Sequence, residues 1–104
     1  MENTMPTTEI QIDEKIKQKT QEPKRWKVVL LNDDTTPMDF VVGILTEIFK
    51  HSQETAKNVT MEIHNTGSGV AGVYSFEIAE VKAVEATQLA RANGFPLQIK
   101  MEEE

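Results

Sequence analysis

WKVVLLNDDTTPM, residues 26–38, leads from apolar residues into a polar cluster and then into a helix start. Its first six residues are rich in Val and Leu and include an aromatic, which is typical of a short buried strand. Thr36 is placed to cap a helix whose first residue is Pro37. Gly43 weakens that helix by up to about 1 kcal/mol relative to alanine. Apolar residues recur along one face of this helix, at Phe40, Val41, Ile44, Leu45, Ile48 and Phe49.

Two more helices are predicted downstream. Ser52 can cap the second helix and Ser75 the third. The second ends at residues 65–69, NTGSG, and the third ends at residues 93–94, Asn-Gly. Small side chains give the third helix a slim face that can lie close to a sheet, namely Ala79, Ala83, Ala86 and Ala90.

Residues 70–74 and 97–101 complete the predicted strands. The element order is therefore β-α-α-β-α-β. This order predicts an α+β fold: a single small domain in which a three-stranded, mainly antiparallel sheet packs on helices.

Residues 1–25 differ in composition from the rest of the chain. Glu, Lys, Gln and Thr dominate them, and aliphatic residues are few. Such a segment cannot bury enough apolar surface to offset its ordering entropy. We predict a flexible N-terminal extension over residues 1–25 and a folded core domain over residues 26–104.

Charge and composition narrow the functional classes. The formal net charge is −6 and the pI is about 4.9, which argues against sequence-independent binding to nucleic acid. The absence of cysteine excludes disulfides and thiolate zinc sites. No apolar run approaches the roughly 18 residues that span a bilayer, and no secretory signal pattern is present. We expect a cytoplasmic protein with no cofactor, metal, nucleic-acid partner or membrane partner.

A polar cluster follows the first strand. Asn32, Asp33 and Asp34 supply an amide and two carboxylates, although turns alone also favour Asn and Asp. His64 lies near the end of the second helix, where a histidine is usually a satisfied surface or core residue. Together, an imidazole, an amide oxygen and a carboxylate can each accept a hydrogen bond, and the carboxylate adds charge. This combination suits an ammonium group.

Apolar residues lie close to that cluster in the predicted fold. Met38, Val41, Ile63 and Leu97 are each explained by core packing when taken singly. As a set they could line a pocket beside the polar cluster, and methionine is the flexible residue expected where side chains of different shape are accepted.

Several segments carry a resemblance to one family. Residues 28–41, VVLLNDDTTPMDFV, are similar to the signature of ClpS, the bacterial adaptor of the N-degron pathway. Residues 63–64, residues 69–74 running into 77–82, and residues 90–97 agree at matching spacing. The resemblance covers the chain from residue 26 to the C-terminus.

The resemblance implies an adaptor that binds the first residue of a substrate protein when that residue is Leu, Phe, Tyr or Trp. It implies delivery to the unfoldase ClpA, or ClpC in some lineages, which feeds the protease ClpP. Asn32, Asp34 and His64 would hold the free α-amino group, with Asp33 adjacent. Met38 would exclude β-branched first residues from a pocket lined by Thr36, Met38, Val41, Thr60, Ile63 and Leu97.

The resemblance also implies a second surface. Glu77 and Lys82 match the family's docking face for the N-terminal domain of ClpA, and the N-terminal extension matches the segment that engages the unfoldase during delivery. Thr60 stands where members often have Met, which leaves the preference among Leu, Phe, Tyr and Trp open. Asn65 stands where an aromatic is frequent, which puts part of the unfoldase-facing surface in question.

Two other functions are compatible with parts of the sequence. A small hydrolase could use Asp33, Asp34, His51 and His64 in acid–base or metal-assisted chemistry, although their spacing matches no metal signature. A generic protein-interaction or ribosome-stalk-like domain could share this element order, because fold does not fix function.

Overall fold

The computed structural model describes residues 23–104, so residues 1–22 of the flexible extension predicted over residues 1–25 lie outside the described residues. Within the described part the elements follow in the predicted order: β1 Trp26–Leu31, α2 Met38–Glu47, α3 Gln53–Thr66, β2 Ser68–Tyr74, α4 Phe76–Ala92 and β3 Gln98–Glu103.

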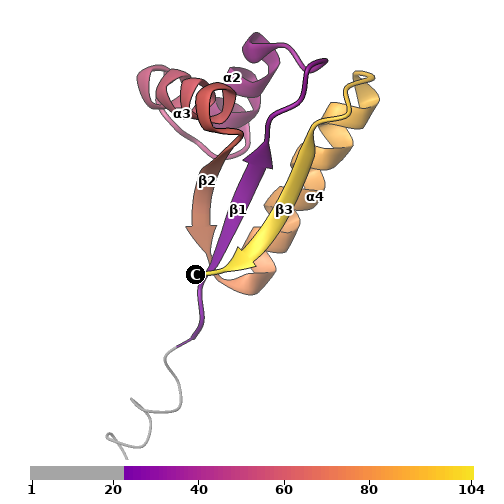
Figure 1. Ribbon diagram of the computed structural model, residues 1–104. Coiled ribbons are helices and arrows are strands. Elements are labelled where there is room, and N and C mark those ends of the chain that lie inside the picture. Colours follow the sequence, from indigo (N-terminus) through magenta and orange to yellow (C-terminus); the bar gives the residue numbers. More distant parts are fainter. Residues whose placement is uncertain (1–22) are drawn as a thin grey trace, which may run out of the picture.

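The strands form one sheet with β1 in the middle. Their order is β2-β1-β3, and β1 is antiparallel to both neighbours. Figure 1 shows α4 along one face of the sheet, whereas α2 and α3 gather at the end where β1 stops. The predicted α+β fold is confirmed, and the polar turn after β1 lies at the end of the sheet that α2 and α3 cover.

The core lies between β1 and the helices. Val28 and Leu30 of β1 are fully buried. Alanines of α4 are buried against this core, namely Ala79, Ala86 and Ala90. Their small side chains let the helix axis approach the sheet closely, as the alanine spacing predicted.

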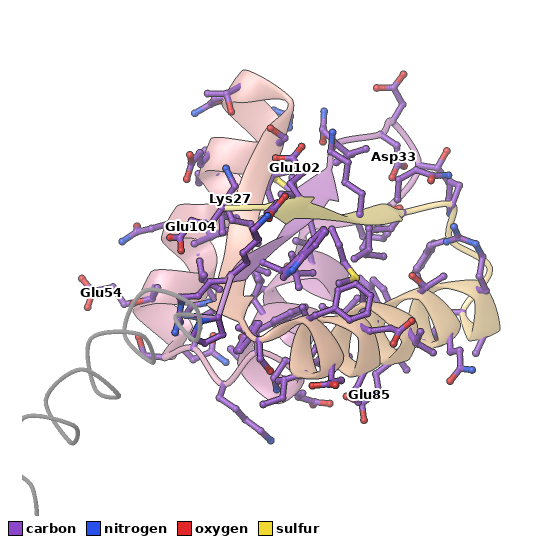
Figure 2. The ribbon with its side chains drawn as sticks, turned by 90° about the horizontal axis from the view of Figure 1, so that it is seen from below. Lys27, Asp33, Glu54, Glu85, Glu102 and Glu104 are labelled. Atoms are coloured by element: carbon purple, nitrogen blue, oxygen red, sulfur yellow. The ribbon has the colours of Figure 1, made fainter. Side chains whose placement is uncertain are left out.

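Charged side chains cover the opposite face of β1. Val29 is buried there, and its partner in β3 is Lys100. The Glu102 carboxylate lies 2.8 Å from the Lys100 ammonium and 3.7 Å from that of Lys27. Glu102 and Lys27 are labelled in Figure 2. Lysine stems can shield an apolar neighbour while their charges stay in water. The hydrogen bond and charge of Lys100 hold the pKa of Glu102 below its ordinary value.

Both outer strands extend further than the sequence indicated. β2 begins at Ser68 because that residue pairs with Leu31, and β3 continues to Glu103 because that residue pairs with Trp26. The start of the described chain also contacts the sheet: the Arg25 guanidinium donates to the Val73 carbonyl at 3.0 Å. Cross-strand partners therefore set these strand ends, and local sequence does not reveal them.

The helix caps are only partly as predicted. Ser52 caps α3, and its hydroxyl accepts a hydrogen bond from the Thr55 amide at 3.1 Å. Ser75 is the N-cap of α4 by its backbone conformation. The prediction that Thr36 caps α2 is wrong, because Pro37 occupies the cap position and the Thr36 hydroxyl donates to Asp33 instead.

None of the helices within residues 23–104 combines the length and the unbroken apolar sequence that crossing a membrane requires.

Candidate functional site

The end of β1 meets the end of α3. The backbone N–H of Asn32 donates to the Gly67 carbonyl at 2.9 Å. Gly67 ends α3 in a left-handed conformation with φ 98°, and His64 lies in the last turn of that helix. Asn32 and His64 are far apart in sequence, yet the fold places their segments side by side.

The side chains of Asn32, Asp34 and His64 are exposed to solvent at this end of the molecule. Within residues 23–104 none of the three makes a side-chain hydrogen bond or ion pair. Their acceptor atoms are therefore open to a ligand. That they act together on an amine, as the sequence suggested, stays a prediction.

The Asp33 side chain, labelled in Figure 2, makes hydrogen bonds that those of its two sequence neighbours do not make. Its Oδ1 accepts hydrogen bonds from the Thr35 and Thr36 amides, each at 2.7 Å, and its Oδ2 accepts one from the Thr36 hydroxyl at 2.8 Å. Partial burial alone would raise the pKa of Asp33, but these hydrogen bonds and the charge of Arg91 outweigh it and lower the pKa. Asp33 therefore organises the turn that carries Asn32 and Asp34.

Arg91 belongs to the same end of the molecule, and the sequence did not single it out. Its guanidinium donates to the carbonyls of Phe95 and Leu97, at 3.0 and 2.7 Å, and so fixes the turn between α4 and β3. Arginine is common near the end of a helix, so the sequence alone does not distinguish Arg91, and its importance is evident only from these contacts in the folded chain.

The residues expected to line a side-chain pocket divide into three groups. Val41, Ile63 and Leu97 are buried in the core. Thr36 is half-buried and bonded to Asp33. Met38 and Thr60 line an open groove of about 530 Å³ between α2 and α3. In this structure the groove thus contains two of the expected residues, and the rest lie in the core and in the turn.

This α2–α3 groove has one wall from each helix. The sequence did not predict most of its lining, although each wall follows helical spacing: Met38, Asp39, Val42 and Gly43 on α2, and Gln53, Lys57, Thr60 and Met61 on α3. Thr60 is buried, and its hydroxyl donates to the Ala56 carbonyl at 2.7 Å. The hydroxyl proton is thus used within its own helix and is not offered to a ligand in the groove.

Gly69 allows α3 to pack on β2 next to His64. A Cβ atom added at this position would lie 2.7 Å from Cγ1 of Ile63. We expect Gly69→Ala to lower the free energy of unfolding by about 1–3 kcal/mol, because a well-packed site must shift to admit the methyl group. Urea unfolding measures this change. Ser68→Ala, whose serine hydroxyl makes no hydrogen bond within residues 23–104, should stay within about 0.5 kcal/mol; equal effects of the two substitutions would contradict the packing role.

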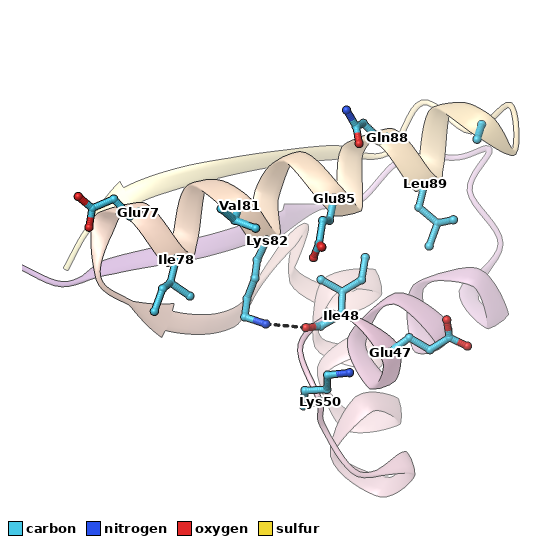
Figure 3. Close-up of a pocket in the computed structure, with 11 residues that line it drawn as sticks. Glu47, Ile48, Lys50, Glu77, Ile78, Val81, Lys82, Glu85, Gln88 and Leu89 are labelled. Carbon is cyan, nitrogen blue, oxygen red and sulfur yellow. Dashed lines mark hydrogen bonds between the residues drawn. The ribbon is translucent and has the colours of Figure 1, made fainter.

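A second groove, the α4 groove, lies between α4 and the end of α2 (Figure 3). Its volume is about 920 Å³, and its lining includes Glu47, Glu77, Ile78, Val81, Lys82 and Leu89. Ile78 and Val81 are about half exposed, at 51% and 57%. An apolar surface with acidic residues around it is thus open on α4, and it contains both residues expected to dock the unfoldase.

Lys82 is engaged inside the molecule. Its ammonium donates to the Ile48 carbonyl at 2.8 Å, as Figure 3 shows. It also lies 5.4 Å from the centre of the Tyr74 ring and 6.0 Å from that of Phe49. These contacts tie the end of α2 to α4, so Lys82 shapes the groove whether or not it touches a partner.

Two of the four residues considered for hydrolysis, His51 and Asp33, already make hydrogen bonds within the fold. The His51 ring nitrogen Nε2 is hydrogen-bonded to the Ala71 carbonyl, and the Asp33 oxygens hold the turn. Ala71 lies beside an irregularity in the pairing of β1 and β2 between Val28 and Val29. His51 therefore satisfies a carbonyl of the sheet.

Comparison with known proteins gives a consistent result. Residues 21–100 match the family described as ATP-dependent Clp protease adaptor protein ClpS. A ClpS adapter protein of Bdellovibrio bacteriovorus is 50% identical over 82 residues, covering 79% of this chain and 72% of that protein. The ClpS adapter of Oleidesulfovibrio alaskensis is 44% identical over 101 residues, covering 97% of this chain and 93% of that protein.

A solved structure is similar in both sequence and fold. It is that of Agrobacterium tumefaciens ClpS2 bound to L-phenylalaninamide, with a TM-score of 0.77 and 47% identity. The match covers 80% of this chain and all of that chain.

Proposed function

This chain belongs to the ClpS family of Clp protease adaptor proteins, and we propose that it recognises substrates by a free N-terminal Leu, Phe, Tyr or Trp. It then delivers them to the unfoldase ClpA, or to ClpC, for degradation by ClpP. The family is one of adaptors rather than of catalytic proteins. The observation that carries the proposal concerns Asn32, Asp34 and His64. Their side chains are exposed at one end of the sheet, near Met38, and their acceptor atoms make no hydrogen bond within residues 23–104.

The amino group is bound by these three side chains. A protonated amine donates up to three hydrogen bonds, and an amide oxygen, a carboxylate and a neutral imidazole can each accept one. The ligand of the Agrobacterium protein supports this assignment, because L-phenylalaninamide has a free α-amino group, an aromatic side chain and a carboxamide in the place of a peptide bond. Asp33 acts through the turn, since its own oxygens already accept hydrogen bonds from Thr35 and Thr36.

The first side chain enters beside Met38 and Thr60. Burial of one Leu or Phe side chain contributes roughly 1.5–3 kcal/mol, and hydrogen bonds to a charged group contribute about 1.5–3 kcal/mol each. Together these terms are compatible with a micromolar or tighter dissociation constant. Val41, Ile63 and Leu97 form the buried layer on which the pocket rests, and Thr36 holds the turn at its edge.

The α4 groove is the proposed docking surface for the N-terminal domain of the unfoldase. Glu77 is exposed on it and available for direct contact. Lys82 contributes by holding Ile48 and the end of α2 in place. Residues 1–25 form the extension that engages the unfoldase during delivery, and residues 26–104 form the domain that binds the substrate.

A degradation assay tests the proposal. Purified ClpA and ClpP, with ClpC as a second unfoldase, are given a reporter protein that begins with Leu, with and without this chain. We expect the chain to accelerate degradation of the Leu-first reporter but not of a Val-first reporter or of an N-acetylated one. Equal degradation of all three reporters would contradict recognition of the N-terminal residue.

Met38 is expected to exclude β-branched first residues. It is the first residue of α2 and is 39% exposed at the groove. Met38→Ala removes its side chain and should improve binding of Val-first and Ile-first peptides by at least about tenfold, because one buried apolar side chain is worth this much in free energy. Fluorescence anisotropy measures it. Met61→Ala, on the facing wall, serves as the control and should still exclude Val-first and Ile-first peptides. A Met38→Ala variant that excludes these peptides as strongly as the wild type would show that Met38 does not exclude β-branched residues.

A further inference from the structure

Four of the five glycines have a structural reason. Gly67 and Gly94 adopt positive φ angles of 98° and 79°, which side-chain-bearing residues rarely adopt. Gly69 and Gly72 have no room for a Cβ atom, because other side chains of the fold occupy the space. Replacement at any of these positions would strain the backbone or the packing.

Gly43 has neither reason. Its φ angle is not positive, and apart from its chain neighbours and the backbone of its own helix no heavy atom lies within 4 Å of the position that a Cβ atom would take. It lies in the interior of α2, where glycine is among the least favourable residues. The fold would tolerate alanine there and would gain helix stability from it. The presence of glycine therefore points to a requirement for empty space.

The empty space is part of the α2–α3 groove. Gly43 lines this groove together with Met38 and Thr60, the two residues that the groove shares with the proposed pocket. At a rise of about 1.5 Å per helical residue, Gly43 lies about 7–8 Å beyond Met38 along α2. The ring system of tryptophan is larger than a leucine side chain, so a tryptophan that enters beside Met38 needs more of the groove than a leucine does.

We infer that Gly43 is a specificity-determining residue that keeps the part of the α2–α3 groove beside it open for an aromatic first residue, an inference that rests on the proposed function. Other groove residues favour a ring as the occupant. Met38 and Met61 are 39% and 47% exposed, and flexible thioethers adapt to flat rings and contact them favourably. Thr60 adds a short wall whose hydroxyl proton is used within its own helix.

Peptides that differ only in their first residue test the inference. Leu-first and Trp-first peptides, each free and N-acetylated, are titrated by fluorescence anisotropy against the wild-type chain and three variants. Gly43→Leu fills the groove, Gly43→Ala fills it partly, and Glu47→Leu places the same side chain on α2 at a residue of the other groove. Thermal melts accompany each variant, and Gly43→Ala should melt at a higher temperature than the wild type.

The expected result is a selective loss. Gly43→Leu should weaken Trp-first binding at least tenfold and Leu-first binding by less than threefold, Gly43→Ala should give an intermediate loss for Trp, and Glu47→Leu should change neither. An unchanged ratio of Trp to Leu affinity in both Gly43 variants would overturn the role of Gly43 while leaving the proposed function in place. If the wild-type chain does not distinguish free from acetylated peptides, the proposed function fails, and this inference fails with it.

Discussion

His64→Ala is expected to weaken binding of Leu-first peptides by about 10- to 100-fold without a change in unfolding temperature. The imidazole is exposed in the last turn of α3 and makes no hydrogen bond within residues 23–104, so the fold loses nothing when it is removed. The ligand loses one hydrogen bond from a charged donor, which is worth about 1.5–3 kcal/mol. Fluorescence anisotropy with a free-amine peptide measures the loss.

A neighbouring substitution provides the control. Asn65→Ala also removes an exposed side chain from the last turn of α3. It should leave the affinity within about twofold, because substitution of a surface residue that makes no specific contact usually changes the free energy by less than about 0.5 kcal/mol. Equal affinity of the wild type and the His64→Ala variant for the peptide would show that the imidazole does not bind the amino group.

Asp33 and Asp34 form a matched pair: substitution of either should weaken peptide binding, but only substitution of Asp33 should lower the stability of the fold. Asp33→Ala removes the acceptor of three hydrogen bonds in the turn and should lower the free energy of unfolding by about 1–3 kcal/mol, as loss of comparable caps and charged acceptors does. It should also weaken peptide binding, because the turn positions Asn32 and Asp34. Asp34→Ala removes the same charge at an exposed position and should weaken binding with little change in stability.

The pH dependence of the same pair provides a second check. The pKa of Asp33 is lowered in the folded chain, so its stabilising effect is present at neutral pH and is lost as the pH falls through the folded-state pKa. The difference in unfolding free energy between wild type and Asp33→Ala should therefore shrink between about pH 5 and pH 2. A difference that stays constant over this interval would show that the carboxylate charge does not hold the turn.

Local patterns predicted the fold well because its core is built on simple periodicities. The alanines of α4 indicated a close helix–sheet contact, and the buried Ala79, Ala86 and Ala90 confirm it. The strand ends were less predictable. Ser68 and Glu103 belong to strands because they face Leu31 and Trp26, and such pairing depends on residues far away in the sequence.

The candidate site was predictable where single residue types carry the chemistry. An amide, carboxylates and an imidazole indicated a site for an amine, and the fold brings the segments of Asn32 and His64 together. Contacts between elements were not predictable. The bond from Lys82 to Ile48 crosses from α4 to α2, and the space beside Gly43 exists only between two packed helices. Both depend on the rotation of each helix about its axis.

The most direct measurement is a pair of calorimetric titrations of the wild-type chain, one with L-phenylalaninamide and one with N-acetyl-L-phenylalaninamide. The two ligands share the ring and the carboxamide and differ in the protonated amine. We predict saturable binding of the first and at least a hundredfold weaker binding of the second, because acetylation removes the charge and two donors from the group that Asn32, Asp34 and His64 bind. Equal affinity for both ligands would contradict recognition of the free amino group.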